Sequence, residues 1–310
     1  MAAVDVPPIR IPDGYGVWAL TDLHGQLAAV DRLLGRAGIT DGGGHWTAPR
    51  GTALVITGDC VDRGPDSVGL VRRLVSLRAQ AAASGGLVAI LEGNHEAQVL
   101  GGLAGEPGIF AALMAFGGGA TLASAGMAPG SWSGMGADEL RATIDALAPD
   151  FLPALWTFAP WARWRDVLFV HAGPVPDQPL EQWTRGADRL WIRGDFFASS
   201  ERFPDAPCWA PYRDAGLGRV VFGHTQVPAP TLTHEGRALN LDTGKGGVIT
   251  LAGLPADADL ARATFLAEPA EAPAILDAPI SGEAVRRFDT GLPAVVDAWL
   301  ERVGEDHPRP

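Results

Sequence analysis

The chain has 310 residues, of which 47% are hydrophobic and 19% charged, enough apolar material for one large domain or two ordinary ones. Lysine and arginine together number 24 against 36 aspartate and glutamate residues, a formal net charge of −12. A chain this acidic is a poor general binder of nucleic acid or of anionic membranes, because phosphate neutralisation needs clustered lysine and arginine. Any phosphate must therefore be met locally, by a metal ion or by a few placed arginines.

Cysteine usage and apolar runs set the expected compartment. Cys60 and Cys208 form neither a CxxC pair nor a disulfide framework. The start, MAAVDVPPIRIPDGYG, lacks a basic region followed by a long apolar stretch, and no run approaches 18 apolar residues, so we expect no signal peptide and no transmembrane helix. The expectation is a cytoplasmic protein without membrane partners, and its oligomeric state stays open.

Short apolar runs that end in polar or glycine-bearing turns predict the strands. In chain order they are Gly16–Gly25, Thr52–Gly64, Leu87–Glu96, Val167–Gly173, Arg219–Thr225 and Ala238–Gly244, with a further strand at Gly247–Gly253. Helical patterns follow the first three runs, at Gln26–Arg36, Asp66–Ala83 and Glu96–Leu103. This strand–loop–helix repetition predicts an α/β protein with buried strands.

The pattern changes in the segment 101–164 and again after residue 253. In the segment 101–164, glycine-rich pieces flank helical stretches at Asp138–Ala148 and Phe151–Trp156. We interpret this segment as an insertion suited to cap or wall a site. Residues 254–310 are rich in proline, alanine and acids, with one amphipathic helix predicted at Pro293–Val303. We assign no chemistry to this tail.

Polar side chains gather where the predicted strands end. They are Asp22 and His24 after the first strand, Asp59, Asp62 and Arg63 after the second, Asn94 and His95 after the third, His171 after the fourth and His224 after the fifth. Any one of them has a structural explanation, such as helix capping by Asp22 or a turn at Asn94. Four of the seven histidines at strand ends are harder to attribute to chance. Because ligand sites in open α/β sheets lie outside the carboxyl ends of the strands, we predict one shared site.

The donor types in this set predict a metal centre. Carboxylate, imidazole and amide oxygen without thiolate suit manganese, iron, zinc or nickel, and the donors suffice for two ions. Two-metal hydrolases hold their ions roughly 3.5–4 Å apart, where a bridging carboxylate offsets their mutual repulsion. Asp59, on a middle strand, is the predicted bridge, and a water shared by both ions would become hydroxide near neutral pH.

The turn after the second strand also predicts an acid and a phosphate clamp. The planar fork of Arg63 is suited to hold phosphate oxygens bidentately. Asp62 is placed to pair with a histidine and fix its tautomer, and His95 is the candidate. Such a pair keeps an imidazolium available as a general acid for the leaving group.

The motifs TDLHG, GDCVDRG, GNHE, HAG and GHT, in this order, resemble those of the calcineurin-like metallophosphoesterase superfamily, and within it the bacterial and phage phosphoprotein phosphatases. The resemblance covers roughly Gly16 to Gly253. It implies a sandwich of two mixed β-sheets flanked by helices, with a helical insertion. We expect a single domain over 1–310, with a catalytic core at about 16–253, the insertion at about 101–164 and a C-terminal extension at about 254–310.

The resemblance also implies a role for each motif residue. Asp22 and His24 match ligands of a first metal, and Asn94, His171 and His224 match ligands of a second metal, with Asp59 as the bridge between them. Asp62 and His95 match an acid pair, and Arg63 and Arg193 match two phosphate-binding arginines. Arg193 comes from RLWIRGDFF, which otherwise reads as a strand or short helix, and Asp242 in NLDTG is interpreted as structural. Thr21 stands where the family usually has glycine.

These roles predict a metal-dependent phosphomonoester hydrolase that uses a hydroxide bridging two divalent ions, with manganese expected and iron, zinc or nickel as alternatives. The expected substrate is a phosphorylated protein, carrying phosphoserine, phosphothreonine or also phosphotyrosine, or a small phosphate ester. One alternative is a dinucleoside polyphosphate hydrolase, a branch that tends to carry alanine in place of Asp62 and GHW in place of GHT. A phosphodiesterase is disfavoured by Arg193 and the acidic charge, and a non-catalytic scaffold would need neither metal site nor acid pair.

Overall fold

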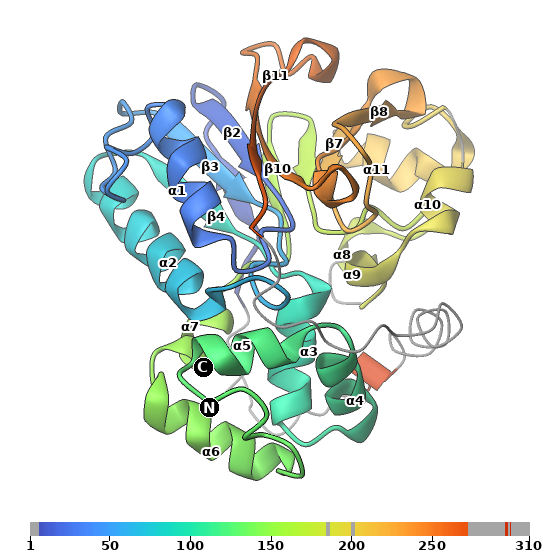
Figure 1. Ribbon diagram of the computed structural model, residues 1–310. Helices are drawn as coiled ribbons and strands as arrows, with labels where there is room; N and C mark the ends of the chain where they lie inside the picture. Colours follow the sequence, from blue (N-terminus) through green and yellow to red (C-terminus); the bar gives the residue numbers. More distant parts are fainter. Residues whose placement is uncertain (1–5, 184–186, 200–201, 272–294, 297, 299–310) are drawn as a thin grey trace.

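Two facing mixed β-sheets form the centre of the computed structural model, which describes residues 6–183, 187–199, 202–271, 295–296 and 298 (Figure 1). One sheet has the order β1-β5-β6-β7-β9-β8 and the other β11-β10-β2-β3-β4. The strands of the first are β1 (Ile9–Ile11), β5 (Ala162–Trp164), β6 (Val167–Phe169), β7 (Arg219–Phe222), β8 (Thr231–Thr233) and β9 (Ala238–Asn240). Those of the second are β2 (Gly16–Leu20), β3 (Thr52–Ile56), β4 (Leu87–Ile90), β10 (Val248–Leu254) and β11 (Thr264–Pro269). The predicted fold class is confirmed.

Alternation along the strands divides the core into layers. In β3, Ala53 and Val55 face the other sheet, whereas Leu54 and Ile56 face the helices. Successive side chains of a strand point to opposite faces, so a strand buried on both faces reads as a continuous apolar run. This is why the run at Thr52 predicted a strand although it shows no polar alternation.

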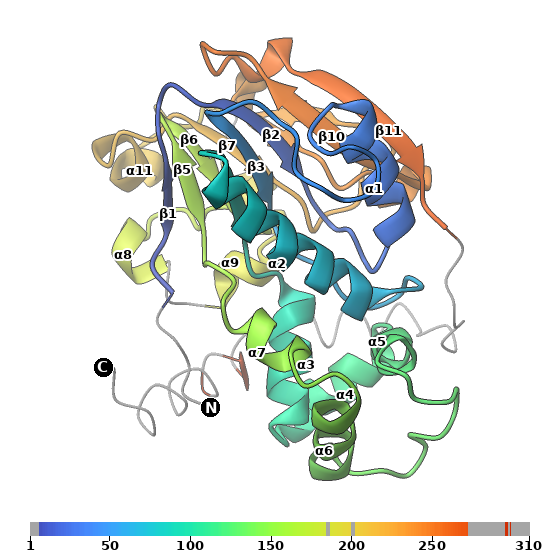
Figure 2. The ribbon, with the colours of Figure 1, turned by 90° about the vertical axis from the view of Figure 1, so that its left-hand side faces the viewer.

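Helices α1 (Leu27–Arg36) and α2 (Ser67–Ala83) cover the outer face of the five-stranded sheet (Figure 2). Asp66 caps α2, since its carboxylate accepts a hydrogen bond of 2.7 Å from the backbone N–H of Gly69. The helix predicted to start at Asp66 therefore starts one residue later.

Short helices cover the outer face of the six-stranded sheet. They are α8 (Leu180–Trp183), α10 (Gly194–Ala198) and α11 (Ala210–Asp214), together with the 3₁₀ turn η1 (Pro207–Trp209). Helix α9 (Asp188–Trp191) instead packs in the core shared by the five-stranded sheet and the insertion. Further 3₁₀ turns are η2 (His234–Gly236), η3 (Thr243–Gly246) and η4 (Leu260–Arg262). Phe196 of α10 packs edge-on against Trp209 and Phe222, with ring centroids 5.9 and 5.0 Å away. Arg193, expected in a strand or helix, lies in the break between α9 and α10.

The predicted insertion contains helices that gather at one end of the sandwich (Figure 1). They are α3 (Asn94–Leu103), which enters it, α4 (Pro107–Ala115), α5 (Gly118–Ser124), α6 (Ala137–Leu147) and α7 (Phe151–Leu155). Among the described residues no single helix is long and apolar enough to cross a membrane, although α4 and α5, bent by 80°, meet the length and composition test together.

Four short strands were not expected from the sequence: β1, β5, β8 and β11. β11 lies in the predicted C-terminal extension, where it pairs antiparallel with β10 and forms an edge of its sheet. The helix predicted at Pro293–Val303 falls almost entirely outside the described residues.

Strand register brings the loops of both sheets to one edge. In the parallel strands β2, β3 and β4, Leu20 pairs with Ile56, and Ile56 with Ile90, so the three strands end at the same level. In the other sheet, Phe169 of β6 pairs with Val221 of parallel β7. All five strands that precede the predicted site residues therefore deliver their loops to the same edge.

Candidate active site

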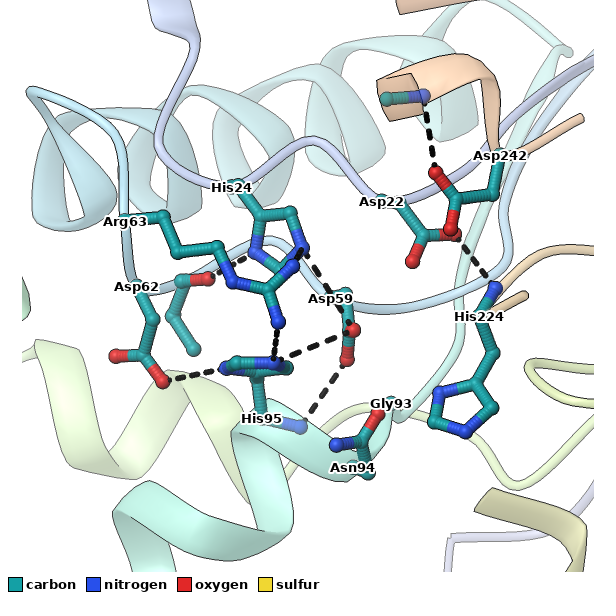
Figure 3. A network of polar contacts seen from close by, with 12 residues as sticks. Asp22, His24, Asp59, Asp62, Arg63, Gly93, Asn94, His95, His224 and Asp242 are labelled. Carbon is teal, nitrogen blue, oxygen red and sulfur yellow. Dashed lines mark hydrogen bonds and ion pairs between the residues drawn. The ribbon is translucent and has the colours of Figure 1, made fainter. Parts of the chain in front are cut away.

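The structure brings the ten predicted site residues to this edge, and most of them are drawn in Figure 3. Six of the ten have left-handed backbone conformations with φ between 39° and 69°. They are Asp22, His24, Asp59, Asp62, Arg63 and His224. Such a conformation costs about 1–3 kcal/mol for a residue with a side chain and concentrates at functional sites, where the surrounding structure maintains it.

Two groups of donor atoms are suited to hold cations, and they share Asp59. The ligand atoms of His24, Asp59 and His95 lie within 4.8 Å of one another, and so do those of Asp59, His171 and His224. All five side chains are buried. The shared position of Asp59 is the arrangement that its predicted bridging role requires.

Backbone carbonyls orient two of the imidazoles. Nδ1 of His24 lies 2.8 Å from the carbonyl oxygen of Val61, and Nδ1 of His171 lies 2.9 Å from that of Thr57. Because a carbonyl oxygen only accepts, each Nδ1 carries the proton and each Nε2 presents a lone pair to the site. Metal-ligating histidines are held in this way by their second ring nitrogen.

Several acceptor atoms converge near Asp59 without a matching donor. Nε2 of His171 lies 2.9 Å from Oδ1 of Asn94 and 3.4 Å from Oδ1 of Asp59, and burial lowers the pKa of His171, which keeps the ring neutral. Nε2 of His224 is buried with no hydrogen-bond partner among the described residues. A divalent cation would satisfy all of these lone pairs, so the residues fit the predicted metal centre.

Asp22 lies beside these groups and belongs to neither of them. Its Oδ2 accepts hydrogen bonds from Thr21 Oγ1 at 2.5 Å and from the backbone N–H of His224 at 3.0 Å. Figure 3 shows its carboxylate next to that of Asp242. Burial and the charge of Asp22 raise the pKa of Asp242 to about 8. Asp242, interpreted as structural, also accepts from the N–H of Gly244 at 3.1 Å.

Two motif glycines are needed because carboxylates pass close to their backbone. A Cβ atom on Gly223 would lie 2.0 Å from Oδ2 of Asp22, and one on Gly93 would lie 2.2 Å from Oδ1 of Asp59. No side chain fits at such separations. The glycines of GHT and GNHE thus leave room for the two acidic ligands that the sequence predicted.

The predicted contact between Asp62 and His95 is present. Nδ1 of His95 lies 2.7 Å from Oδ2 of Asp62, and neither side chain is more than 2% exposed. Burial raises the pKa of Asp62 to about 7, against the opposing effects of a hydrogen bond from Thr121 and the charge of Arg63. Burial and Arg63 hold the pKa of His95 well below its usual value.

Both predicted arginines reach the site. Arg63 donates from Nη1 to Nε2 of His24 at 2.6 Å and from Nη2 to Nε2 of His95 at 2.9 Å. Arg193 donates to the carbonyl oxygen of His224 at 2.9 Å, and its charge helps to lower the pKa of that imidazole. Each of the two donor groups therefore has one of these arginines in contact with at least one of its residues.

One buried carboxylate that supports the site was missed. Glu96 accepts hydrogen bonds from the backbone N–H groups of Cys60 at 2.7 Å, Asp59 at 3.0 Å and Gly93 at 2.7 Å. The quoted motif GNHE contains this residue, and a glutamate three residues after the N-cap Gly93 can accept from the N-cap N–H, a signal that could have identified it. Through its hydrogen bonds to the N–H groups of Asp59 and Cys60, Glu96 thus holds the left-handed turn at Asp59 in place.

The buried carboxyl groups predict a pH dependence for the metal-free protein. The pKa of Asp62 is raised to about 7 and those of Glu96 and Asp242 to about 8, chiefly by burial, from ordinary values of 3.8 to 4.5. The folded state therefore binds these protons more tightly, and the free energy of unfolding falls as pH rises towards 8. The buried histidines have lowered pKa values, so the unfolded state binds their protons more tightly. They make the free energy of unfolding rise with pH, but only below about pH 6.5.

We therefore expect the Tm of chelator-treated protein to fall between pH 6.5 and 8. Asp242→Asn, which keeps the acceptor for Gly244, should flatten this slope, and saturating manganese should remove most of it. A Tm that rises over this interval in the metal-free protein would contradict the raised carboxyl pKa values.

Comparisons with known proteins agree with the fold. Residues 15–228 match the family model of the calcineurin-like phosphoesterases. Shewanella-like protein phosphatase 2 of Arabidopsis thaliana is 35% identical over 78 residues, which is 25% of this chain and only 20% of the plant protein. The asymmetrical bis(5′-nucleosyl)-tetraphosphatase PrpE of Bacillus subtilis (strain 168) is 27% identical over 231 residues, 73% of this chain and 84% of that protein.

A similar solved structure is the cold-active protein-tyrosine phosphatase of a psychrophilic Shewanella species. It has a TM-score of 0.51 and 19% sequence identity, and the alignment covers 86% of this chain and 83% of the phosphatase. At this identity the likeness concerns the fold alone. The family match spans more than half of the chain and includes all ten predicted site residues. The chain therefore belongs to the calcineurin-like phosphoesterases, a family of metal-dependent phosphoesterases.

Proposed function

We propose that this protein is a metal-dependent phosphomonoester hydrolase that acts on phosphorylated proteins. One observation carries the proposal: His95, a member of the donor group with His24 and Asp59, is paired with Asp62 at a nitrogen–oxygen distance of 2.7 Å. The alkoxide of a serine or threonine side chain is a poor leaving group and needs a proton as it departs. An acid pair beside a metal centre is suited to that task.

The metal ions would be held by the predicted ligands. In the predicted assignment, Asp22, His24 and Asp59 would hold one ion, and Asp59, Asn94, His171 and His224 the other. The observed donor groups contain His24, Asp59, His171 and His224 of this set. Bound divalent ions, with manganese the expected metal, would supply a nucleophile from water near neutral pH and would offset the charge of the phosphoryl group.

The other residues of the site act on the substrate. Arg63 and Arg193 would bind phosphoryl oxygens, for which the guanidinium fork is well shaped. Nε2 of His95, which accepts from Arg63 in this structure, would have to take up a proton before giving it to the departing oxygen, while Asp62 holds Nδ1 and stabilises the imidazolium. The name of one similar protein, Shewanella-like protein phosphatase 2, supports a phosphoprotein substrate.

A second candidate is the asymmetrical hydrolysis of dinucleoside tetraphosphates. It is favoured by the alignment with PrpE, which spans 73% of this chain. The phosphoanhydride of such a substrate has a better leaving group and needs less help from an acid. The buried Asp62–His95 pair therefore favours the phosphomonoesterase.

The deciding experiment is a comparison of rates. The protein is stripped with chelator and reloaded with manganese. The rate of hydrolysis of p-nitrophenyl phosphate is first compared with that of bis-p-nitrophenyl phosphate. The rates on phosphoserine and phosphotyrosine peptides are then compared with the rate on diadenosine tetraphosphate. We expect a metal-dependent preference for the monoester and the peptides. Preference for the diester or for diadenosine tetraphosphate would replace the proposal, and an identically purified Asp59→Asn protein controls for contaminating phosphatases.

Loss of either arginine is expected to weaken substrate binding more than turnover. A charge-assisted hydrogen bond contributes about 1.5–3 kcal/mol, so Arg63→Ala and Arg193→Ala should each raise KM for p-nitrophenyl phosphate roughly 10–100-fold. Arg213→Ala is the matched control, since this half-exposed side chain of α11 pairs with Asp214 on the surface. If only Arg213→Ala raises KM, Arg213 rather than the two predicted residues binds the phosphate.

A further inference from the structure

Helix α5 of the insertion places a buried hydroxyl on the far side of the acid pair. Oγ1 of Thr121 donates to Oδ1 of Asp62 at 2.6 Å and accepts from the backbone N–H of Asp62 at 2.9 Å. The other carboxylate oxygen, Oδ2, faces Nδ1 of His95 at 2.7 Å. Thr121 is 1% exposed and lies 59 residues from Asp62 in the chain. Hydroxyl, carboxylate and imidazole thus form one continuous array.

We propose that Thr121 is a positioning residue for the general acid, and that α5 is the element through which the insertion supports catalysis. The inference rests on the proposed function, because it concerns the acid step of phosphomonoester hydrolysis. Thr121 touches neither substrate nor metal ligands, and it acts through Asp62 on the orientation of His95.

A hydroxyl is well suited to this position because it donates and accepts at once. Its proton goes to the carboxylate of Asp62, and its oxygen receives the N–H of the same residue. Ser67, the first residue of α2, lies 3.1 Å from Thr121 Oγ1 and accepts from the same N–H at 3.0 Å. The Thr121 hydroxyl therefore ties α5 and α2 to the turn that carries the acid pair.

A second contact from the same segment supports the neighbouring residue. The backbone N–H of Arg63 donates to the carbonyl oxygen of Gly117 at 3.2 Å. Gly117 has φ of 106°, and a Cβ there would lie 2.8 Å from Cγ of Arg63. Asp62 and Arg63 are consecutive left-handed residues, with φ of 69° and 65°, a conformation that needs external support. Gly117 and Thr121 provide that support from either side of the first turn of α5.

Removal of the Thr121 hydroxyl leaves Oδ1 of Asp62 buried without its donor. A buried carboxylate oxygen without a partner is unfavourable, so the carboxylate would rotate away from its present orientation. Oδ2 would then no longer hold Nδ1 of His95, and Nε2 would no longer be oriented towards the leaving oxygen. The defect should therefore appear in protonation of the leaving group and leave phosphate binding largely intact.

The test uses Thr121→Val, which removes the hydroxyl at nearly constant shape, and Thr121→Ser, which keeps it. With manganese-loaded protein, kcat is measured on phenyl phosphate, a poor leaving group, and on p-nitrophenyl phosphate, a good one. We expect Thr121→Val to lose about 10–100-fold on phenyl phosphate, the usual effect of removing an outer-shell partner, with a much smaller loss on p-nitrophenyl phosphate. KM should change little, and Thr121→Ser should restore the rate on phenyl phosphate.

A second readout does not depend on activity. In metal-free protein, proton NMR should show a downfield Nδ1–H resonance of His95, assigned by its absence in His95→Asn, and this signal should persist in Thr121→Ser and be shifted or lost in Thr121→Val. If Thr121→Val does not fold, Thr121→Ala takes its place in both measurements.

Equal losses on both esters together with an unchanged His95 resonance would overturn the inference and leave the proposed function standing. If wild-type protein hydrolyses neither monoester, the proposed function fails, and the NMR comparison still decides whether Thr121 orients the pair.

Discussion

Replacement of Asp59 by asparagine is expected to abolish most of the turnover without unfolding the protein. Asp59 is the one residue common to both donor groups, so its loss removes a ligand from each proposed ion. Loss of a mere outer-shell partner lowers metal affinity or activity roughly 10–100-fold, and loss of a shared ligand should exceed this. The measurement is kcat on p-nitrophenyl phosphate across a manganese titration.

The same substitution should not destabilise the metal-free protein. Asparagine keeps the Oδ1 acceptor for the backbone N–H of His95, which lies 3.1 Å from the Asp59 carboxylate. Burial and the charge of Asp22 raise the pKa of Asp59 well above its usual value, so the ionised group is unfavourable there without a cation. We expect an unchanged or higher Tm in chelator and a smaller rise in Tm on addition of manganese.

Asp150→Asn is the matched control for Asp59→Asn, because Asp150 is exposed and pairs with Arg72 on the surface. It should retain both turnover and the manganese-dependent rise in Tm. Full activity of Asp59→Asn, with an unchanged response to manganese, would refute the shared-ligand assignment.

Most of the site could be predicted because its residues immediately follow buried strands. Apolar runs identify the strands, and parallel pairing of β2 with β3 and β3 with β4 obliges the loops after Leu20, Ile56 and Ile90 to meet. The pairing of Asp62 with His95 was predicted in the same way and is formed. The ligand roles of all these residues stay predictions, and Asp22 differs from the others in that its Oδ2 is engaged by Thr21 and by the backbone of His224.

What could not be predicted depends on contacts between distant segments. Thr121 lies in a glycine-rich stretch whose pattern shows no link to Asp62, and only the fold brings the two side chains together. The strands β1, β5 and β8 have the sequences IRI, ARW and TLT, in which arginine or threonine interrupts the apolar residues, so none of them stands out as an apolar run. Thr21, which departs from the family pattern, places a hydroxyl on Asp22 that the sequence did not suggest.

Removal of the His95 imidazole is expected to impair substrates in proportion to their need for a proton. General acid catalysis typically contributes 10²–10⁴-fold, so His95→Ala should lose about that much on a phosphoserine peptide and distinctly less on p-nitrophenyl phosphate, whose nitrophenolate leaves without a proton. His95→Asn, which is smaller than histidine and still offers a donor towards Asp62, should show the same difference between substrates.

The position of His95 in a donor group with His24 and Asp59 allows a competing role as a metal ligand. One comparison distinguishes these two roles. Substitution of a general acid leaves the manganese-dependent rise in Tm intact, whereas substitution of a metal ligand reduces it. Equal losses on both substrates, together with a weakened response to manganese, would assign His95 to the metal and leave Asp62 as the residue that orients it.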